Sequence, residues 1–152
     1  MKKAFLFLGL FVSFFAFSAG AFAQKQIQPQ VQRDPVLEAD ATHNLDVARQ
    51  YFTTKKAYKA VLMRFEETYA AYPEFSKMDE FLYYAGMSSY YLSLNKGKQK
   101  VDKKSEMEQA KFAPAKLLED ANAYFTAISE KYPQSAFKAD AEKMLKELET
   151  KK

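Results

Sequence analysis

The amino-acid sequence predicts an all-α fold, in which antiparallel helix pairs stack as a short α-solenoid of about five helices. Apolar residues recur at helical spacing along most of the chain, whereas glycine and the β-branched residues that favour strands are scarce. Two stretches also share one pattern, an aromatic residue eight positions before a proline that follows a tyrosine: Phe65 before Pro73, and Phe125 before Pro133. A helix packs through an apolar stripe, and a proline just beyond its end prevents its continuation.

Residues 1–23 are typical of a secretory signal peptide. Lys2 and Lys3 form a positive region, an apolar run follows, and Ala-Phe-Ala at 21–23 offers the small residues that signal peptidase requires. We therefore expect cleavage after residue 23 and export of the rest, in a bacterium, to the periplasm or the periplasmic face of the outer membrane. The alternative is an uncleaved anchor, because residues 4–23 are just long enough to span a bilayer.

Residues 24–34 are predicted to be a linker, and residues 35–150 a single helical domain. Asp34 and Pro35 form a typical helix start, with an acidic N-cap followed by proline. A capping box at Ser76 and Asp79 is expected to open the third helix, and Ser135 to cap the fifth. Five helices are expected, at about 35–52, 56–72, 76–94, 114–132 and 136–149.

The third and fifth expected helices differ in the width of their apolar surfaces. The third is apolar around most of its circumference, so it is either buried on all sides or exposes an adhesive face. The fifth has one apolar stripe among lysines and glutamates, as a terminal helix of a stacked array should.

The composition argues against most chemistry. The sequence has no cysteine, so it has no thiol nucleophile, disulfide or thiolate metal site. Its one histidine, His43, lacks neighbours that would build a catalytic or metal-binding set, and there is no phosphate-binding loop. The formal net charge of +4 includes the signal lysines, and the remaining near balance does not predict nucleic-acid binding. We expect no enzyme activity, cofactor or metal.

The repeated pattern resembles the tetratricopeptide repeat, a pair of antiparallel helices of 34 residues whose second helix is closed by a proline. Arg49 departs from this family, which prefers glycine there, and the second unit contains an insertion at 95–112. The resemblance implies that the matching residues pack the repeats: Leu45, Ala48, Phe52, Val61, Phe65, Pro73, Leu82, Ala85, Gly86, Ala121, Phe125 and Pro133.

Within this superfamily, residues 57–61, 79–86 and the two Tyr-Pro pairs are similar to the BamD family. Those proteins are periplasmic components of the machinery that inserts β-barrels into the outer membrane. The resemblance implies a non-enzymatic scaffold that binds envelope proteins, among them β-barrel assembly subunits. The family's lipid-bearing cysteine is missing here. The alternative is a stand-alone envelope adaptor, related to the tetratricopeptide proteins of the Tol-Pal system or to cell-wall enzymes.

In stacked helix pairs the first helix of each unit lines one common surface. Projection of the matched positions places these residues on that surface: His43, Asp46, Gln50, Glu80, Tyr83, Tyr84, Met87, Tyr90 and Tyr91. The binding residues are predicted to be Asp46, Gln50, Glu80, Tyr83, Met87 and Tyr90. Tyr83, Met87 and Tyr90 would anchor a partner segment, and Glu80 and Gln50 would fix its backbone. The alternative is that these rings pack against the later helices as core.

The insertion at 95–112 is rich in lysine but also contains acidic residues. Ser105 and Glu108 match a capping box, so a short helix is expected to begin there. The insertion is interpreted either as a basic loop in weak contact with anionic lipid or an acidic partner, or as a mobile, solvated loop.

Overall fold

The computed structural model describes residues 33–150, which belong to one compact unit, Gln32–Lys152. The predicted signal peptide and most of the predicted linker lie outside the described residues. In the described part every regular element is helical, which confirms the all-α prediction. The elements are α1 (Pro35–Gln50), the π-helical turn η1 (Tyr51–Lys55), α2 (Tyr58–Ala71), α3 (Met78–Ser93), α4 (Glu106–Lys111), α5 (Pro114–Lys131) and α6 (Lys138–Glu149).

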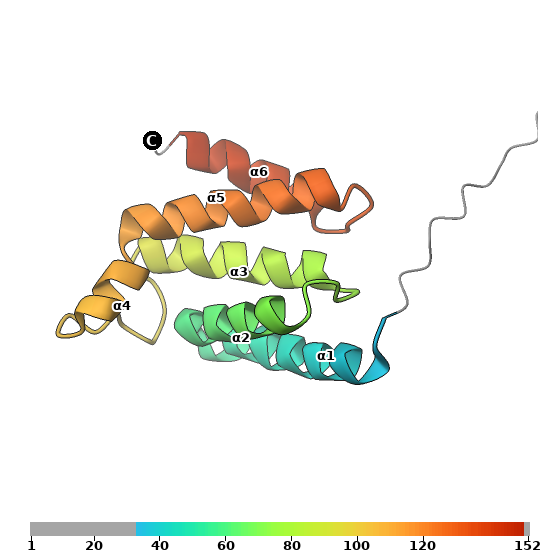
Figure 1. Ribbon diagram of the computed structural model, residues 1–152. Coiled ribbons are helices and arrows are strands. Elements are labelled where there is room, and N and C mark those ends of the chain that lie inside the picture. Colours follow the sequence, from blue (N-terminus) through green and yellow to red (C-terminus); the bar gives the residue numbers. More distant parts are fainter. Residues whose placement is uncertain (1–32, 151–152) are drawn as a thin grey trace, which may run out of the picture. The chain divides into compact units, whose positions relative to one another are not determined.

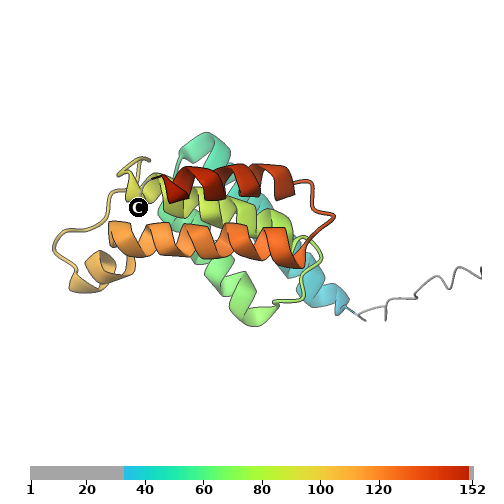
Figure 2. The same cartoon turned by 90° about the horizontal axis from the view of Figure 1, so that it is seen from above.

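The five long helices run antiparallel to their neighbours in the chain (Figure 1). In this unit α2 packs on α1 and α3, α3 packs chiefly on α5, and α5 packs on α6. Seen from above, α5 and α6 lie side by side (Figure 2). Between residues 33 and 150, none of the helices is both long and apolar enough to cross a bilayer.

The first helix begins as predicted, and the third does not. Asp34 Oδ1 accepts hydrogen bonds from two backbone N–H groups of the first turn of α1, at 2.8 and 3.3 Å. The expected capping box of α3 is wrong, because Lys77 is the N-cap and makes no side-chain cap bond. The two capping-box residues bind distant partners instead. The N–H of Ser76 donates to Glu38, and Asp79 accepts from the Ser135 hydroxyl at 2.6 Å.

The two Tyr-Pro turns have the same backbone hydrogen bonds. Each turn has two consecutive backbone hydrogen bonds, both from the N–H of a residue to the carbonyl three residues before it. The first of the two acceptors is the tyrosine carbonyl. The donors and acceptors are Phe75 to Tyr72 and Met78 to Phe75 in one turn, and Ser135 to Tyr132 and Lys138 to Ser135 in the other. The exposed Pro73 and Pro133 follow α2 and α5, whose ends they therefore set. A shared sequence pattern thus produces a shared turn.

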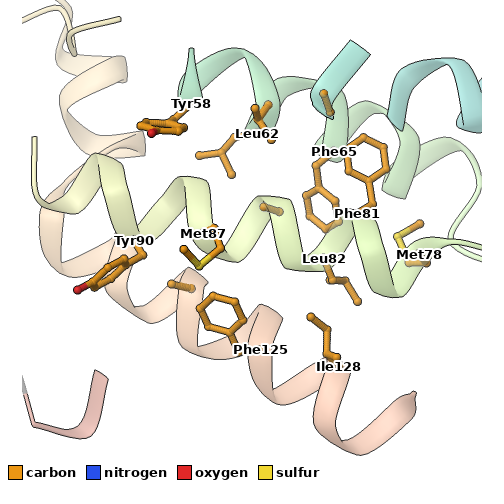
Figure 3. Close-up of a cluster of buried hydrophobic side chains, with 14 of the residues drawn as sticks. Tyr58, Leu62, Phe65, Met78, Phe81, Leu82, Met87, Tyr90, Phe125 and Ile128 are labelled. Carbon is orange, nitrogen blue, oxygen red and sulfur yellow. The ribbon is translucent and has the colours of Figure 1, made fainter. Parts of the chain in front are cut away.

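The hydrophobic core is centred on α3, ten of whose sixteen residues are buried. Figure 3 shows Phe65 and Phe81 on the side of α3 that meets α2, and Phe125 and Ile128 on the side that meets α5. Phe65 and Phe81 pack edge to face, with ring centroids 5.6 Å apart. The residues matched to the repeat are buried except for Phe52, which is half-buried, and the two prolines. The terminal helix α6 buries a single stripe of Ala141, Met144 and Leu148.

Gly86 allows α3 and α5 to approach closely. A Cβ atom built at Gly86 would lie 2.7 Å from Cε1 of Phe125, which is closer than side-chain atoms normally come. Phe125 itself is fully buried. The missing side chain at Gly86 therefore makes room for the Phe125 ring of α5, and the two residues form a matched pair across the core.

The insertion at 95–112 contains α4 and is fixed to α2. Lys59 Nζ pairs with Glu108 at 2.6 Å, and the side chain of Gln99 accepts from the N–H of Ala60, in the first turn of α2, at 3.1 Å. Ser105 accepts from the N–H of Glu108, as its predicted capping role requires. The solvated-loop interpretation does not account for these contacts, since the segment satisfies part of the N-terminus of α2.

Replacement of Gly97 by alanine is expected to destabilise the helical unit by about 1–3 kcal/mol. Gly97 has φ +100°, and an added Cβ would lie 2.7 Å from the Tyr58 ring and 2.8 Å from the Lys56 carbonyl oxygen. Urea unfolding followed by circular dichroism measures the change. The neighbouring Lys98→Ala variant keeps its backbone bond to Lys56 and should change stability by less than about 0.5 kcal/mol. Equal stability of the two variants would contradict the role of Gly97.

Candidate partner-binding face

Half-buried aromatic side chains from three parts of the chain meet along one side of α3. They are Phe52 from η1, Tyr83, Tyr84 and Tyr91 from α3, and Phe137 at the N-cap of α6, and together they are called the aromatic face. Ring centroids lie 5.1 Å apart for Phe52 and Tyr84, 5.8 Å for Tyr83 and Tyr84, and 5.0 Å for Tyr83 and Phe137. The rings therefore form a connected series from the end of α1 to the start of α6.

Helical spacing explains why these rings share a side. Tyr84 and Tyr91 are seven residues apart on α3, which is almost two turns, and Tyr83 lies next to Tyr84 toward α6. Phe52 contacts both Tyr84 and Tyr91, the latter at 6.0 Å between centroids. Burial is the main cause that raises the pKa of the Tyr83 and Tyr84 phenols, so both side chains stay neutral at physiological pH.

An ion-paired cluster joins α1 to α3 beside Tyr84. The guanidinium of Arg49 binds both oxygens of Glu80, with Nε to Oε1 and Nη2 to Oε2 each at 2.6 Å. Its Nη1 also pairs with Asp46 at 2.5 Å. The hydrogen bonds that Arg49 donates to Glu80 are the main reason why the pKa of Arg49 is raised. This two-point pairing fixes α1 relative to α3 beside Tyr84.

The structure separates the predicted binding residues into two groups. Tyr83 lies on the aromatic face, and Arg49 brings Asp46 and Glu80 together beside it. His43 and Gln50 are exposed on α1. Met87 and Tyr90 are only 9% and 6% exposed and belong to the core, on the α5 side of α3 (Figure 3). The hydroxyl of Tyr90 donates to Glu147 of α6. Of the two interpretations, core packing describes Met87 and Tyr90. Tyr83, Tyr84 and Tyr91 are half-buried against the core, and Tyr83 also contacts Phe125 of α5.

Sequence reasoning assigned no binding role to Arg49, Phe52 or Phe137. Phe137 precedes the last helix as its N-cap and stacks on Tyr83. Arg49 is the residue that departs from the glycine of the resembling family. The sequence signal for a special role of Arg49 was a charged residue at a position where that family has a small one. The signal does not identify the partner, because Glu80 lies 31 residues away in the sequence.

Lysines flank the other end of the aromatic face. Lys56 Nζ lies 5.9 Å from the centroid of the Phe52 ring, and Lys96 Nζ lies 5.5 Å from that of Tyr91. Both are cation–π distances. The aromatic face therefore has carboxylates near Glu80 at one end and ammonium groups near Tyr91 at the other.

A small polar cavity of about 110 Å³ lies away from the aromatic face, between α2, α3 and α5. Its walls include Ser89, Lys111, Lys116, Asp120 and Tyr124. The hydroxyl of Ser89 is fully buried and makes no hydrogen bond. Two rim lysines are already paired, Lys111 with Glu66 and Lys116 with Asp120, so the cavity offers no uncompensated charge. No set of three or more potential metal ligands occurs in the part of the chain that the structure describes.

Alkaline pH is expected to destabilise the fold through Tyr124. Burial, with smaller contributions from nearby acidic side chains, raises the pKa of Tyr124 from 10.0 to about 12. Because the folded state holds the phenol proton more tightly, this stabilisation is complete below about pH 10 and is lost as pH rises toward 12. Tyrosinate absorbance and chemical unfolding between pH 9 and 12 measure both effects. The Tyr124→Phe variant should lose the late absorbance step and the Tyr69→Phe variant should keep it; an unchanged titration in Tyr124→Phe would refute the assignment.

Comparison of the chain with family models, with curated proteins and with solved structures gave no match. The resemblance to tetratricopeptide and BamD proteins therefore rests on the residues quoted above. The described residues form an all-helical unit in which half-buried aromatic rings and charged side chains share one face.

Proposed function

We propose that this chain is a non-enzymatic scaffold of the bacterial cell envelope, which is exported to the periplasm and holds a segment of another protein against the aromatic face. In this role it would resemble the helical component of the outer-membrane β-barrel assembly machinery. The observation that supports the proposal most directly is the series of five half-buried rings from η1, α3 and the start of α6.

Half-buried aromatic rings are suited to binding for two physical reasons. Tyrosine and phenylalanine have large surfaces and few rotatable bonds, so a partner gains contact area at a small cost in side-chain entropy. The rings of Tyr83, Tyr84 and Phe137 already pack on one another, which restricts them before a partner arrives. An aromatic anchor at the centre of an interface typically contributes about 2 kcal/mol or more to binding, roughly a thirtyfold change in affinity.

The helix arrangement also supports the proposal. Antiparallel neighbours and two identical Tyr-Pro turns are compatible with stacked helix pairs, in which the first helices share one surface. The contacts of α3 with α1 through Arg49, and with the start of α6 through Tyr83, are those expected of three first helices side by side.

Affinity purification from native envelopes tests the proposal. The tagged full-length chain is compared with a Tyr83→Ala, Tyr84→Ala double variant and with Tyr69→Ala as the matched control, since Tyr69 is an exposed tyrosine on α2. We expect the double variant to lose at least nine tenths of the recovered partner and Tyr69→Ala to keep it. Circular dichroism first establishes that all three proteins are folded. Equal recovery by folded double variant and wild type would reject the proposal.

The identity of the recovered protein separates the two envelope roles. Co-purification of a β-barrel insertion subunit favours a role in barrel assembly. Co-purification of Tol-Pal or cell-wall proteins favours the alternative, a stand-alone adaptor.

A further inference from the structure

We propose that the aromatic face recognises its partner by the order of charges along the bound segment. A basic side chain of the partner lies at the carboxylate end of the face, and an acidic side chain lies at the lysine end. This inference rests on the proposed function and specifies the chemistry of the segment that is bound.

The carboxylate end contains Asp46, Glu80 and Asp140, and the first two share the single guanidinium of Arg49. Asp140 makes no ion pair within residues 33–150. It lies in the first turn of α6, just after Phe137, whose ring stacks on Tyr83, and its charge contributes to the raised pKa of that phenol. Lys77 and Lys143 are exposed nearby in the sequence, but neither pairs with these carboxylates. Three carboxylates facing one paired cation leave an excess of negative charge beside Tyr83 and Tyr84.

An excess of carboxylate next to aromatic rings favours a cation. An arginine or lysine side chain can lie on the ring face of a tyrosine while its charged group reaches a neighbouring carboxylate. Arg49 already places a cation between a carboxylate and a tyrosine, because its guanidinium binds Glu80 and its charge opposes the rise in the pKa of Tyr84. A basic side chain of the partner can likewise contact the Tyr83 ring and pair with the Asp140 carboxylate.

The opposite end of the aromatic face offers two cations. Lys56 and Lys96 lie over the Phe52 and Tyr91 rings, and neither forms an ion pair in the described chain. The backbone at Lys56 is held by the bond from the N–H of Lys98 to its carbonyl, at 2.9 Å. A carboxylate from the partner would gain charge-assisted hydrogen bonds from both ammonium groups.

The distance between the two ends fixes the spacing of the partner's charges. Glu80 and Tyr91 are eleven residues apart on α3, so the two ends are separated by about 16 Å. An extended segment covers this distance in about five residues, and a helical one in about eleven. The bound segment should therefore contain a basic and an acidic residue at one of these two spacings.

Selection of peptides tests the inference. A phage-displayed library of random peptides, about sixteen residues long so that both spacings fit, is selected on the immobilised full-length chain, and enriched peptides are measured by fluorescence anisotropy. We expect opposite charges at one of the two spacings. Exchange of the two charged residues within a peptide should weaken binding at least tenfold. Asp140→Asn and Lys96→Gln should each weaken binding about fivefold, whereas Lys146→Gln, an exposed lysine of α6, should not.

A charge-reversed protein provides the decisive comparison. The double variant Asp140→Lys, Lys96→Glu should bind the exchanged peptide better than the original one. If enriched peptides lose binding to Tyr84→Ala but tolerate exchange of their charges, the charge-order inference is wrong and the proposed function stands. If no peptide is enriched, or if binding is indifferent to Tyr84→Ala, both the inference and the binding role of the aromatic face are rejected.

Discussion

Replacement of Phe125 by alanine is expected to lower the free energy of unfolding by about 3–5 kcal/mol. Phe125 is fully buried between α3 and α5, and its ring fills the space that Gly86 leaves open. Removal of the ring loses its transfer free energy and leaves a cavity in the centre of the core (Figure 3). Urea unfolding at neutral pH measures the loss.

Gly86 makes this prediction specific to one contact. In the wild-type chain Gly86→Ala should cost about 1–3 kcal/mol, because its Cβ would overlap the Phe125 ring at 2.7 Å. In the Phe125→Ala background the ring is absent, and alanine favours a helix over glycine by about 1 kcal/mol. Gly86→Ala should then be neutral or stabilising. The same cost in both backgrounds would show that the glycine serves another purpose.

Replacement of Arg49 by methionine is expected to destabilise the unit by about 2 kcal/mol. The change removes both hydrogen bonds to Glu80, whose side chain is only 15% exposed, and leaves that carboxylate partly buried without its cation. Thermal and urea unfolding of the variant measure the effect. The double variant Arg49→Met, Glu80→Met removes the uncompensated charge as well and should recover most of the lost stability.

The Lys116–Asp120 pair is the matched control for this ion pair. It joins residues four apart on α5, and the lysine side chain is 51% exposed. Lys116→Met should therefore cost no more than about 0.5 kcal/mol. If Arg49→Met is as mild as Lys116→Met, the Arg49–Glu80 pair does not fix α1 relative to α3.

Local sequence signals located the helices well, because apolar periodicity and proline stops act within a few residues. The ends of α2 and α5 follow from Pro73 and Pro133 in this way. The start of α3 was not predicted correctly, because Ser76 and Asp79 form hydrogen bonds with distant residues. Their partners, Glu38 and Ser135, lie 38 and 56 residues away. The contact of Gln99 with the first turn of α2 was hidden for the same reason. Long-range hydrogen bonds replaced the local ones that sequence patterns predict.

The candidate site was predictable in its helix but only partly in its residues. Periodicity places Tyr83, Met87 and Tyr90 on neighbouring sides of one helix, but it does not say which side a later helix covers. The structure buries Met87 and Tyr90 and leaves Tyr83 half-buried. That division depends on how α5 and α6 pack against α3, and no residue within α3 specifies it.

Site-specific photo-cross-linking in native envelopes tests most directly whether the aromatic face binds a partner. The photoreactive residue p-benzoylphenylalanine replaces Tyr84 on the aromatic face in one variant and the exposed Tyr69 of α2 in another. A discrete cross-linked product from position 84, and none from position 69, is the predicted result. Cross-linking from position 69 alone, or an absence of products from position 84 in a folded and correctly exported chain, would contradict a binding role for this face.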